Sequence, residues 1–424
     1  MMNVSTLINR LKSSQLFKDS FWALVGSTLG KGLSLLSGVV VARFLGSEIY
    51  GEYSLVRSTL LYISIFSTLG LGYSATKYVA EYIKSDKTRI KSLINKVTNI
   101  TFLVSITLAL LQFIFADTIA NFISAPHLNK IIRSFSFLII FNAITTSQIA
   151  ILAGLKEFRK TAIINTYSGI LTFICSAILT YFYGLNGALT SLAIAYTYQC
   201  IISKIEIDRC LKAEYSTANI SSNEVKEIIK FSIPLALQDG LYSVTHWLSW
   251  YLLIQFSSYI EMGISSAAGI WQTIIVFVPA MLKNVMFSHF SSTDNHRSLV
   301  KKMLFINLIT SSIPCFLILL LLNPISSFYG ESYIGLPNVI IVSVIGGIFI
   351  CLGEVFTYEI ISKGRTWLVF SCRLIRDLSA LIALYITLLH ITANQALLYG
   401  IVSQTSHILY LIIIYWVYKE TDYA

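Results

Sequence analysis

Charged residues are scarce in this chain of 424 residues. Asp, Glu, Lys and Arg make up 12% of it, apolar residues make up 55%, and the mean hydropathy is +0.71. An ordinary soluble domain carries about 25% charged residues. So few charges cannot cover a surface in water, so the composition excludes a soluble globular protein and indicates an integral membrane protein.

Long polar stretches are also lacking. Instead, apolar blocks of about 20 residues recur along the chain. Each block can cross about 30 Å of hydrocarbon as a helix, whereas the strands of a membrane barrel would be shorter and alternating. We therefore predict an all-α bundle of about twelve transmembrane helices. The expected spans are 20–42, 54–76, 97–117, 134–154, 161–183, 187–207, 231–256, 264–288, 302–323, 337–359, 366–390 and 394–417.

Lysine and arginine are distributed unequally between the loops. With Lys31 set aside because it lies inside the first span, 26 of these residues fall on the side of the N-terminus and 4 on the other. Basic residues favour the cytoplasmic side, so both termini are expected inside. The net charge of +10 then belongs to short loops facing an anionic leaflet, and it does not indicate nucleic-acid binding.

Catalytic and cofactor signatures are absent from the sequence. There is no Ser-His-Asp or HExxH pattern, and the six cysteines are dispersed without metal-ligand spacing. The segment 26–32 resembles a phosphate-binding loop, but it has too few residues between its glycines and lies inside an apolar span. Its small residues, repeated every four positions from Gly26 to Ala42, are typical of helix packing. We expect no enzyme activity, no metal and no cofactor.

The chain divides into two halves of six spans each. Residues 1–203 form the predicted N-terminal lobe, 204–230 a cytoplasmic linker and 231–424 the C-terminal lobe. At a shift of 212, residues 50–54 fall on residues 262–266, and this places Gly51 on Gly263. Within the linker, Ser221 and Glu224 have the spacing of a helix capping box. Six-helix parallel repeats of this kind are expected in a carrier with a cavity between its lobes.

Two basic residues lie in the first two spans. Lys31 is about eleven residues into its span, near the bilayer midplane, where a charge usually faces a water-filled cavity. Arg57 lies one turn inside the outer end of the second span and could instead extend its side chain to the surface. A structural partner for Lys31 is the alternative to a role in binding.

Polar residues of the second half form further candidates for the cavity. Asp239, Ser243 and His246 form one stripe in the seventh span, where Asp239 could be a counter-ion for Lys31 or a proton-coupling site and His246 could titrate. A satisfied interhelical hydrogen bond is the alternative for this stripe.

Span ten carries a carboxylate at mid-depth, and span eleven carries two opposite charges. At a shift of 206, Glu354 corresponds to Gln148, so both halves could place a polar group at one height. Arg373 and Asp377 are four residues apart, which predicts mutual neutralisation. The candidate cavity residues are thus Lys31, Arg57, Asp239, His246, Glu354 and Gln148.

Several motifs resemble a known family over essentially the whole chain. Residues 39–53, with Ala42-Arg43, Leu45-Gly46 and Tyr50-Gly51-Glu52-Tyr53, resemble the "ARxLG-xxxYGxY" opening of Wzx-type polysaccharide-lipid flippases. These proteins belong to the multidrug/oligosaccharidyl-lipid/polysaccharide exporter superfamily. Residues 69–78 are similar to the family's "LGLGxAxxxY", and the segments 154–160, 230–235 and 328–333 agree as well.

This resemblance implies a carrier with the MATE-like exporter fold in a bacterial inner membrane. Its substrate would be an undecaprenyl-diphosphate-linked oligosaccharide, moved to the outer leaflet by two lobes that rock about a cationic cavity, in O-antigen, capsule or exopolysaccharide synthesis. Lys31 and Arg57 match the basic residues of the family's first two helices. The implied partners are membrane lipids, H⁺ or Na⁺ as coupling ion, and a polysaccharide polymerase with its chain-length regulator.

Two other functions compete with this one. A multidrug or cation antiporter of the same superfamily should carry a carboxylate deep in an N-terminal helix, where this chain has Lys31. A polysaccharide polymerase should have a long outer loop rich in Arg and His, which the sequence lacks.

Overall fold

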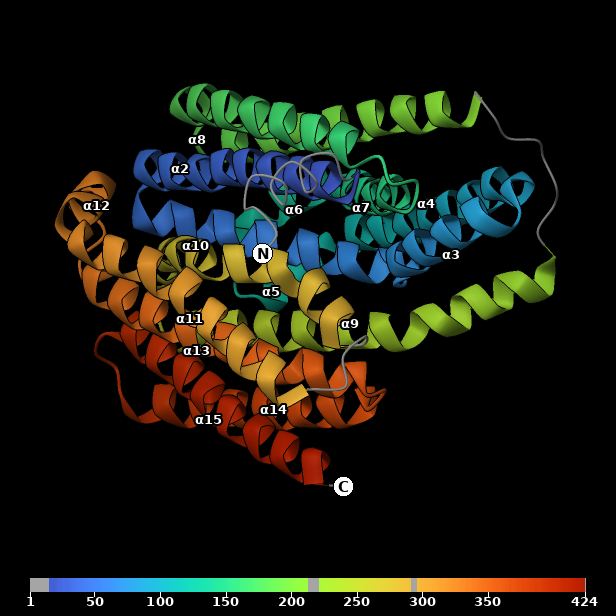
Figure 1. Cartoon of the computed structure of the whole chain (residues 1–424). Helices are drawn as coiled ribbons and strands as arrows, with labels where there is room; N and C mark the ends of the chain where they lie inside the picture. The colour runs from blue at the N-terminus through green and yellow to red at the C-terminus, as the bar shows by residue number, and fades with distance from the viewer. Residues whose placement is uncertain (1–14, 213–220, 291–295, 424) are drawn as a thin grey trace. The chain divides into compact units, whose positions relative to one another are not determined.

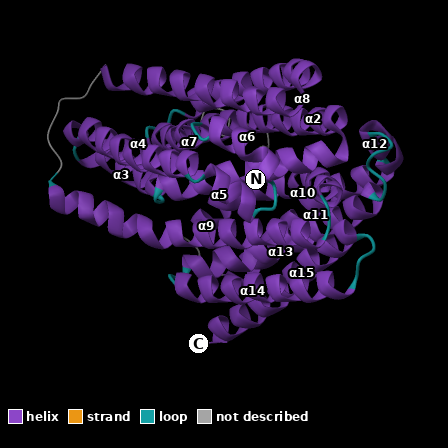
Figure 2. Ribbon diagram, turned by 180° about the vertical axis from the view of Figure 1, so that it is seen from behind, coloured by secondary structure: helices purple, strands orange, loops and turns teal. Residues whose placement is uncertain are grey.

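The computed structural model describes residues 15–212, 221–290 and 296–423, and all their regular structure is helical (Figures 1 and 2). The first half contains α2 (Gln15–Thr68), α3 (Leu71–Ser85), α4 (Ile90–Ile114), α5 (Ala116–Phe122), α6 (Asn129–Ser134), α7 (Leu138–Gly154) and α8 (Phe158–Lys212). The second contains α9 (Ser222–Phe256), α10 (Tyr259–Phe290), α11 (His296–Leu320), α12 (Leu322–Tyr329), α13 (Leu336–Ser362), α14 (Thr366–His390) and α15 (Gln395–Tyr423). The prediction of an all-α chain is confirmed for these residues.

Seven helices in the described residues are long and apolar enough to cross a membrane, or eight if the bent pair Pro126–Ser134 and Leu138–Gly154 counts as one span. Two of the seven, Thr28–Thr68 and Phe158–Leu211, have 41 and 54 residues. Helix α14 is not among them, because any part of it long enough to cross a membrane contains three charged residues, Arg373, Arg376 and Asp377. The chain is a multi-pass membrane protein, and the number of twelve spans stays a prediction.

Glycine interrupts both of the longest helices. In α2 the backbone at Gly46 has φ 72° and ψ 170°, and in α8 Gly184 has φ 54° and ψ −133°. Residues with a Cβ rarely adopt either conformation. The break at Gly184 lies between the predicted spans 161–183 and 187–207, whereas α2 ends earlier than predicted. Leu69 and Gly70, inside the predicted span 54–76, both have positive φ and separate α2 from α3.

The chain packs as two compact units. One comprises residues 1–41 and 56–243, and the other comprises 42–55 and 244–424. The two six-helix lobes expected from the sequence have other boundaries, and they stay a prediction.

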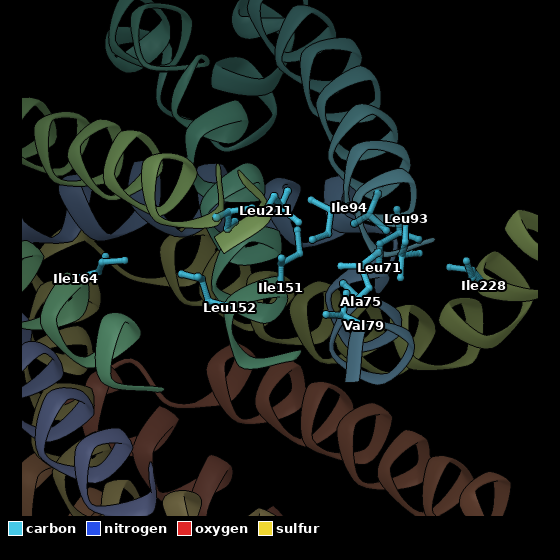
Figure 3. Packing of buried hydrophobic residues seen from close by; sticks show 13 residues of the cluster. Leu71, Ala75, Val79, Leu93, Ile94, Ile151, Leu152, Ile164, Leu211 and Ile228 are labelled. Atoms are coloured by element: carbon cyan, nitrogen blue, oxygen red, sulfur yellow. The ribbon is translucent and has the colours of Figure 1, made fainter. Parts of the chain in front are cut away.

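An apolar cluster holds the first unit together. Leu71 and Val79 of α3, Leu93 of α4 and Ile151 of α7 are fully buried in it, and Figure 3 shows these side chains converging. Ile228 places the start of α9 on the same cluster. That start is fixed by the predicted capping box: the Ser221 N–H donates to Glu224 Oε2 (2.8 Å), and the Glu224 N–H donates to Ser221 Oγ (3.3 Å). Arg89, which follows α3, also binds the Glu224 carboxylate.

The second unit has its own apolar cluster between α10, α11, α13, α14 and α15. Phe290, Val355, Ile360, Val369 and Ile414 are buried there. Helices α13, α14 and α15 lie side by side around it (Figure 1). This packing positions Glu354 of α13 beside Arg373 of α14.

Candidate functional site

Lys31 and Arg57, the two predicted cations of the first unit, are exposed on α2. Arg57 borders a small cavity. The other residues that line it are four leucines and one tyrosine: Leu60, Leu61, Leu138, Leu192 and Tyr196. Both side chains therefore combine a positive charge with a hydrophobic helix surface. Such a surface can hold an anionic head group and an apolar chain together.

The backbone beside Lys31 is fixed by close helix packing. A methyl group added at Gly30 would overlap the carbonyl oxygen of Asn165 on α8, and one added at Gly169 would lie 2.5 Å from the Gly30 carbonyl oxygen. About two helical turns after Gly30, the hydroxyls of Ser37 and Ser176 are 2.7 Å apart. The predicted packing stripe of the first span is confirmed at Gly30.

Asp239 lies on α9 in the first unit, where it accepts a hydrogen bond from the Tyr73 hydroxyl of α3 at 3.2 Å. The two helices approach closely beside this pair: the hydroxyls of Ser74 and Ser232 are 2.5 Å apart, and a methyl group at Gly70 would lie 2.7 Å from the Ser232 carbonyl oxygen. Tyr73 was missed as a candidate because its sequence position does not reveal which helix it faces. The roles predicted for Asp239 stay predictions.

His246 belongs to the second unit, although it is on the same helix as Asp239. Its ring packs against Trp250, with 5.4 Å between the ring centroids. Trp250 is stacked in turn on Tyr399 of α15, with centroids 5.0 Å apart. His246 thus lies in an aromatic group between α9 and α15, a contact that no spacing along α9 could indicate.

Glu354 forms an ion pair with Arg373, and this corrects one prediction. The Arg373 guanidinium lies 3.0 Å from Glu354 Oε1 on the neighbouring helix α13. Asp377, the expected partner of Arg373, instead pairs with Arg376 at 2.7 Å. The four-residue spacing within α14 would allow the predicted pair, but the carboxylate that α13 presents is the one that Arg373 reaches.

Gln148, the predicted counterpart of Glu354, is only 3% exposed on α7. Its Oε1 atom has no hydrogen-bond partner among the described residues. The two residues thus have different surroundings, one buried in the first unit and one in an ion pair of the second. Their common role as cavity residues stays a prediction.

Comparison with known proteins adds a family. Residues 16–294 match the family model described as "Polysaccharide biosynthesis protein". The chain belongs to this family. Its fold is that of the exporter superfamily that the sequence motifs resemble.

Individual relatives are distant. An uncharacterised membrane protein of the archaeon Methanocaldococcus jannaschii is 25% identical over 240 residues, which cover 54% of this chain and 56% of that protein. The chain therefore matches only about half the length of this relative.

Solved structures share the fold. An inward-facing multidrug resistance MATE family transporter has a TM-score of 0.76 at 14% identity, covering 94% of this chain and 98% of its own. The lipid II flippase MurJ, in an inward closed conformation, has a TM-score of 0.73 at 16% identity, covering 92% and 86%. The MATE-like fold predicted from the motifs is confirmed.

Proposed function

We propose that the protein is a flippase that moves a polyprenyl-diphosphate-linked oligosaccharide from the inner to the outer leaflet. The observation that supports this most directly is that α2, a hydrophobic helix of a polysaccharide biosynthesis protein, carries two exposed cations, Lys31 and Arg57. The substrate class would be undecaprenyl diphosphate carrying a repeat unit of O-antigen, capsule or exopolysaccharide. The membrane would be the bacterial cytoplasmic membrane.

The chemistry of the two cations suits a diphosphate. An ammonium and a guanidinium both form charge-assisted hydrogen bonds with phosphate oxygens, and the guanidinium can do so with two at once. Leu61, the one partly exposed leucine beside Arg57, would contact the lipid chain. Alternating access of the two predicted lobes, 1–203 and 231–424, would carry the head group across while the chain stays in lipid.

Energy coupling and partners follow from the same proposal. Asp239 and His246 are the groups that could bind or release H⁺, and Na⁺ is the other candidate ion. Glu354 is already paired with the Arg373 guanidinium, so a coupling cation would have to displace that ion pair. Beyond membrane lipids, the partners would be the polymerase that uses the flipped repeat unit and its chain-length regulator.

The competing function is a multidrug or cation antiporter, which the fold shared with a multidrug transporter favours. Because this chain has Lys31 where such an antiporter should carry a carboxylate, Asp239 of α9 would have to bind the exchanged cation instead. Export of a cationic dye distinguishes the two functions, because a carrier whose site binds anions should not bind or export such a dye.

Proteoliposomes with a fluorescent polyprenyl-diphosphate oligosaccharide in the outer leaflet provide the test. A quencher added outside measures the fraction that the protein has moved inward. Lys31→Ala and Arg57→Ala should each slow movement about tenfold to a hundredfold, since a charged hydrogen bond contributes about 1.5–3 kcal/mol. Lys130→Ala, which removes a charge from an exposed position on the short helix α6, should move the lipid at the wild-type rate. Equal rates for all four proteins would contradict the proposal.

A further inference from the structure

The interruption of α2 at Gly46 leaves two helix ends that need hydrogen-bond partners. The last four carbonyls before a break and the first four N–H groups after it have no partner within their own helix. Here these groups belong to residues 42–45 and 47–50. Ala42 and Ser47 are nearly fully buried, so water cannot serve both ends of the break.

One segment from the second half of the chain supplies these partners. The Tyr333 hydroxyl donates to the Ala42 carbonyl oxygen at 2.9 Å. The Ser47 N–H donates to Ser332 Oγ at 3.3 Å, and the Ser47 hydroxyl donates to the Ser332 carbonyl oxygen at 2.7 Å. Two neighbouring residues thus hold both sides of the break. They come from the motif 328–333, and the break lies in the motif 39–53, so two separate sequence motifs form a single contact.

Neighbouring aromatic residues fix that segment to the second half. The Trp271 Nε1–H of α10 donates to the Tyr329 hydroxyl at 3.0 Å, and the rings of Tyr329 and Tyr333 pack edge to face with centroids 5.1 Å apart. Gly330 has φ 92°, and a methyl group there would overlap the Arg43 guanidinium. The segment 328–333 is therefore attached to α10 through Trp271, and it contacts residues 42–47 through Ser332 and Tyr333.

A reciprocal glycine contact lies beside these hydrogen bonds. A methyl group at Gly51 would overlap the carbonyl oxygen of Tyr259, and one at Gly263 would overlap the carbonyl oxygen of Ser47. The shift of 212 that relates Gly51 to Gly263 also relates Ser47 to Tyr259. Tyr259 is the first residue of α10, and Ser47 is the first residue of α2 after its break. The carbonyl at each of these helix starts faces the glycine of the other helix. The two starts, one from each half of the chain, cross as a symmetric pair, as in small-residue helix crossings in membranes.

The crossing is closely packed at its centre but not fully satisfied along α10. Two and three residues beyond Gly263, the hydroxyls of Ser265 and Ser266 are buried and have no hydrogen-bond partner among the described residues. Buried hydroxyls without partners cost free energy.

We propose that this crossing is an outer latch. It comprises Gly46, Ser47 and Gly51 from the first half and Gly263, Ser332 and Tyr333 from the second. In the orientation predicted from the positive-inside pattern, it lies at the outer ends of the spans. In the closed state, the latch holds residues 42–55 against the start of α10 and against Ser332 and Tyr333, all within the second unit. Opening toward the outside separates Gly51 from Tyr259 and Gly263 from Ser47, and breaks the hydrogen bonds to Ser332 and Tyr333. The proposal rests on the proposed function only in that opening serves translocation.

The test measures how often the latch opens, and it needs no substrate. Ser47→Cys, buried in the closed state, is labelled from outside with a membrane-impermeant maleimide in proteoliposomes. Gly263→Ala adds a methyl group that only the closed state cannot accommodate, so it should shift the population toward the open state and speed labelling about tenfold. Gly269→Ala, on the same helix with no described atom within 4 Å of the added methyl, should leave the labelling rate unchanged.

Two further measurements separate latch opening from unfolding. Ser191→Cys reports on a buried position in the first unit, and its labelling should stay slow in the Gly263→Ala background. Tyr333→Phe removes one hydroxyl without adding volume, and should speed labelling of Ser47→Cys several-fold even if Gly263→Ala does not fold. Identical labelling rates of Ser47→Cys in the Gly263→Ala, Tyr333→Phe and Gly269→Ala backgrounds would overturn the latch. Loss of lipid movement alone would bear only on the proposed function.

Discussion

The two glycine breaks of this chain are similar in backbone and different in surroundings. Gly46 and Gly184 both take conformations that other residues avoid. At Gly46, however, hydrogen bonds reach the chain from Ser332 and Tyr333, 285 and 291 residues away from their partners. At Gly184 no described atom lies within 4 Å of an added methyl group, and the close approach is local, between Gly187 and the Leu179 carbonyl.

This difference separates a turn from a latch. A break that is packed by its own two helices can keep its shape in any conformation of the protein. A break whose helix ends depend on a distant segment is tied to the conformation in which that segment is near. Backbone strain alone therefore does not mark a moving part, whereas long-range satisfaction of helix ends does.

The largest effect is expected where an added atom overlaps backbone. Gly51→Ala and Gly263→Ala should each destabilise the closed state by about 1–3 kcal/mol or more, because neither carbonyl oxygen can move without its helix. Gly269→Ala should have no such effect. Thermal unfolding in detergent measures the three changes, and an unfolding temperature for Gly51→Ala equal to that of Gly269→Ala would show that the crossing is not closely packed.

Next in size are alanine substitutions at the breaks themselves. Gly46→Ala and Gly184→Ala should cost similar amounts, about 1–3 kcal/mol each, because both force a residue with a Cβ into a disfavoured conformation. Only Gly46→Ala should also change the labelling rate of Ser47→Cys. If Gly184→Ala changed that rate as much, the two breaks would be equivalent and the comparison would fail.

A smaller effect is expected from single hydroxyl groups. Tyr333→Phe removes the hydrogen bond to the Ala42 carbonyl oxygen and should cost about 0.5–1.5 kcal/mol, the net contribution of one hydrogen bond. Tyr183→Phe beside Gly184 removes a hydroxyl from a ring that is 68% exposed and should change stability little. Unfolding curves in denaturant distinguish the pair, and equal midpoints would argue that Tyr333 does not satisfy the break.

The smallest effect concerns pH, because no carboxylate takes part in the latch hydrogen bonds. At the start of α9, the Ser221 N–H, the Ser221 hydroxyl and Arg89 hold the pKa of Glu224 below its ordinary value. A lowered pKa stabilises the folded state above the ordinary value of about 4.3, and this contribution is lost as the pH falls from that value through the lower pKa of the folded state. Glu224→Gln should therefore show a smaller loss of stability than the wild type when the pH is lowered from 7 to well below 4. Tyr333→Phe should keep the wild-type acid dependence.

Local features of the fold were predictable from the sequence. Apolar blocks predicted helices, the Ser221 and Glu224 spacing predicted the cap of α9, and small residues predicted the packing of Gly30 against α8. Each depends on residues close together in the chain or on one face of one helix.

Long-range partners were not predictable. The ion pair of Glu354 with Arg373 joins two helices, and the neighbouring Asp377 offered a plausible partner within α14. The hydrogen bonds of Tyr73 with Asp239 and of Tyr333 with Ala42 likewise depend on tertiary packing. Motif resemblance indicated that residues 39–53 and 328–333 matter, but not that they form one contact.

A disulfide across the latch tests most directly whether the latch must open for the lipid to move. Ser47→Cys and Ser332→Cys are combined in one chain, with each single variant as a control for the six native cysteines. After mild oxidation, movement of the fluorescent polyprenyl-diphosphate oligosaccharide should stop in the double variant only, and a reducing agent should restore it. A fully cross-linked double variant that moves the lipid at its unlinked rate would contradict the account.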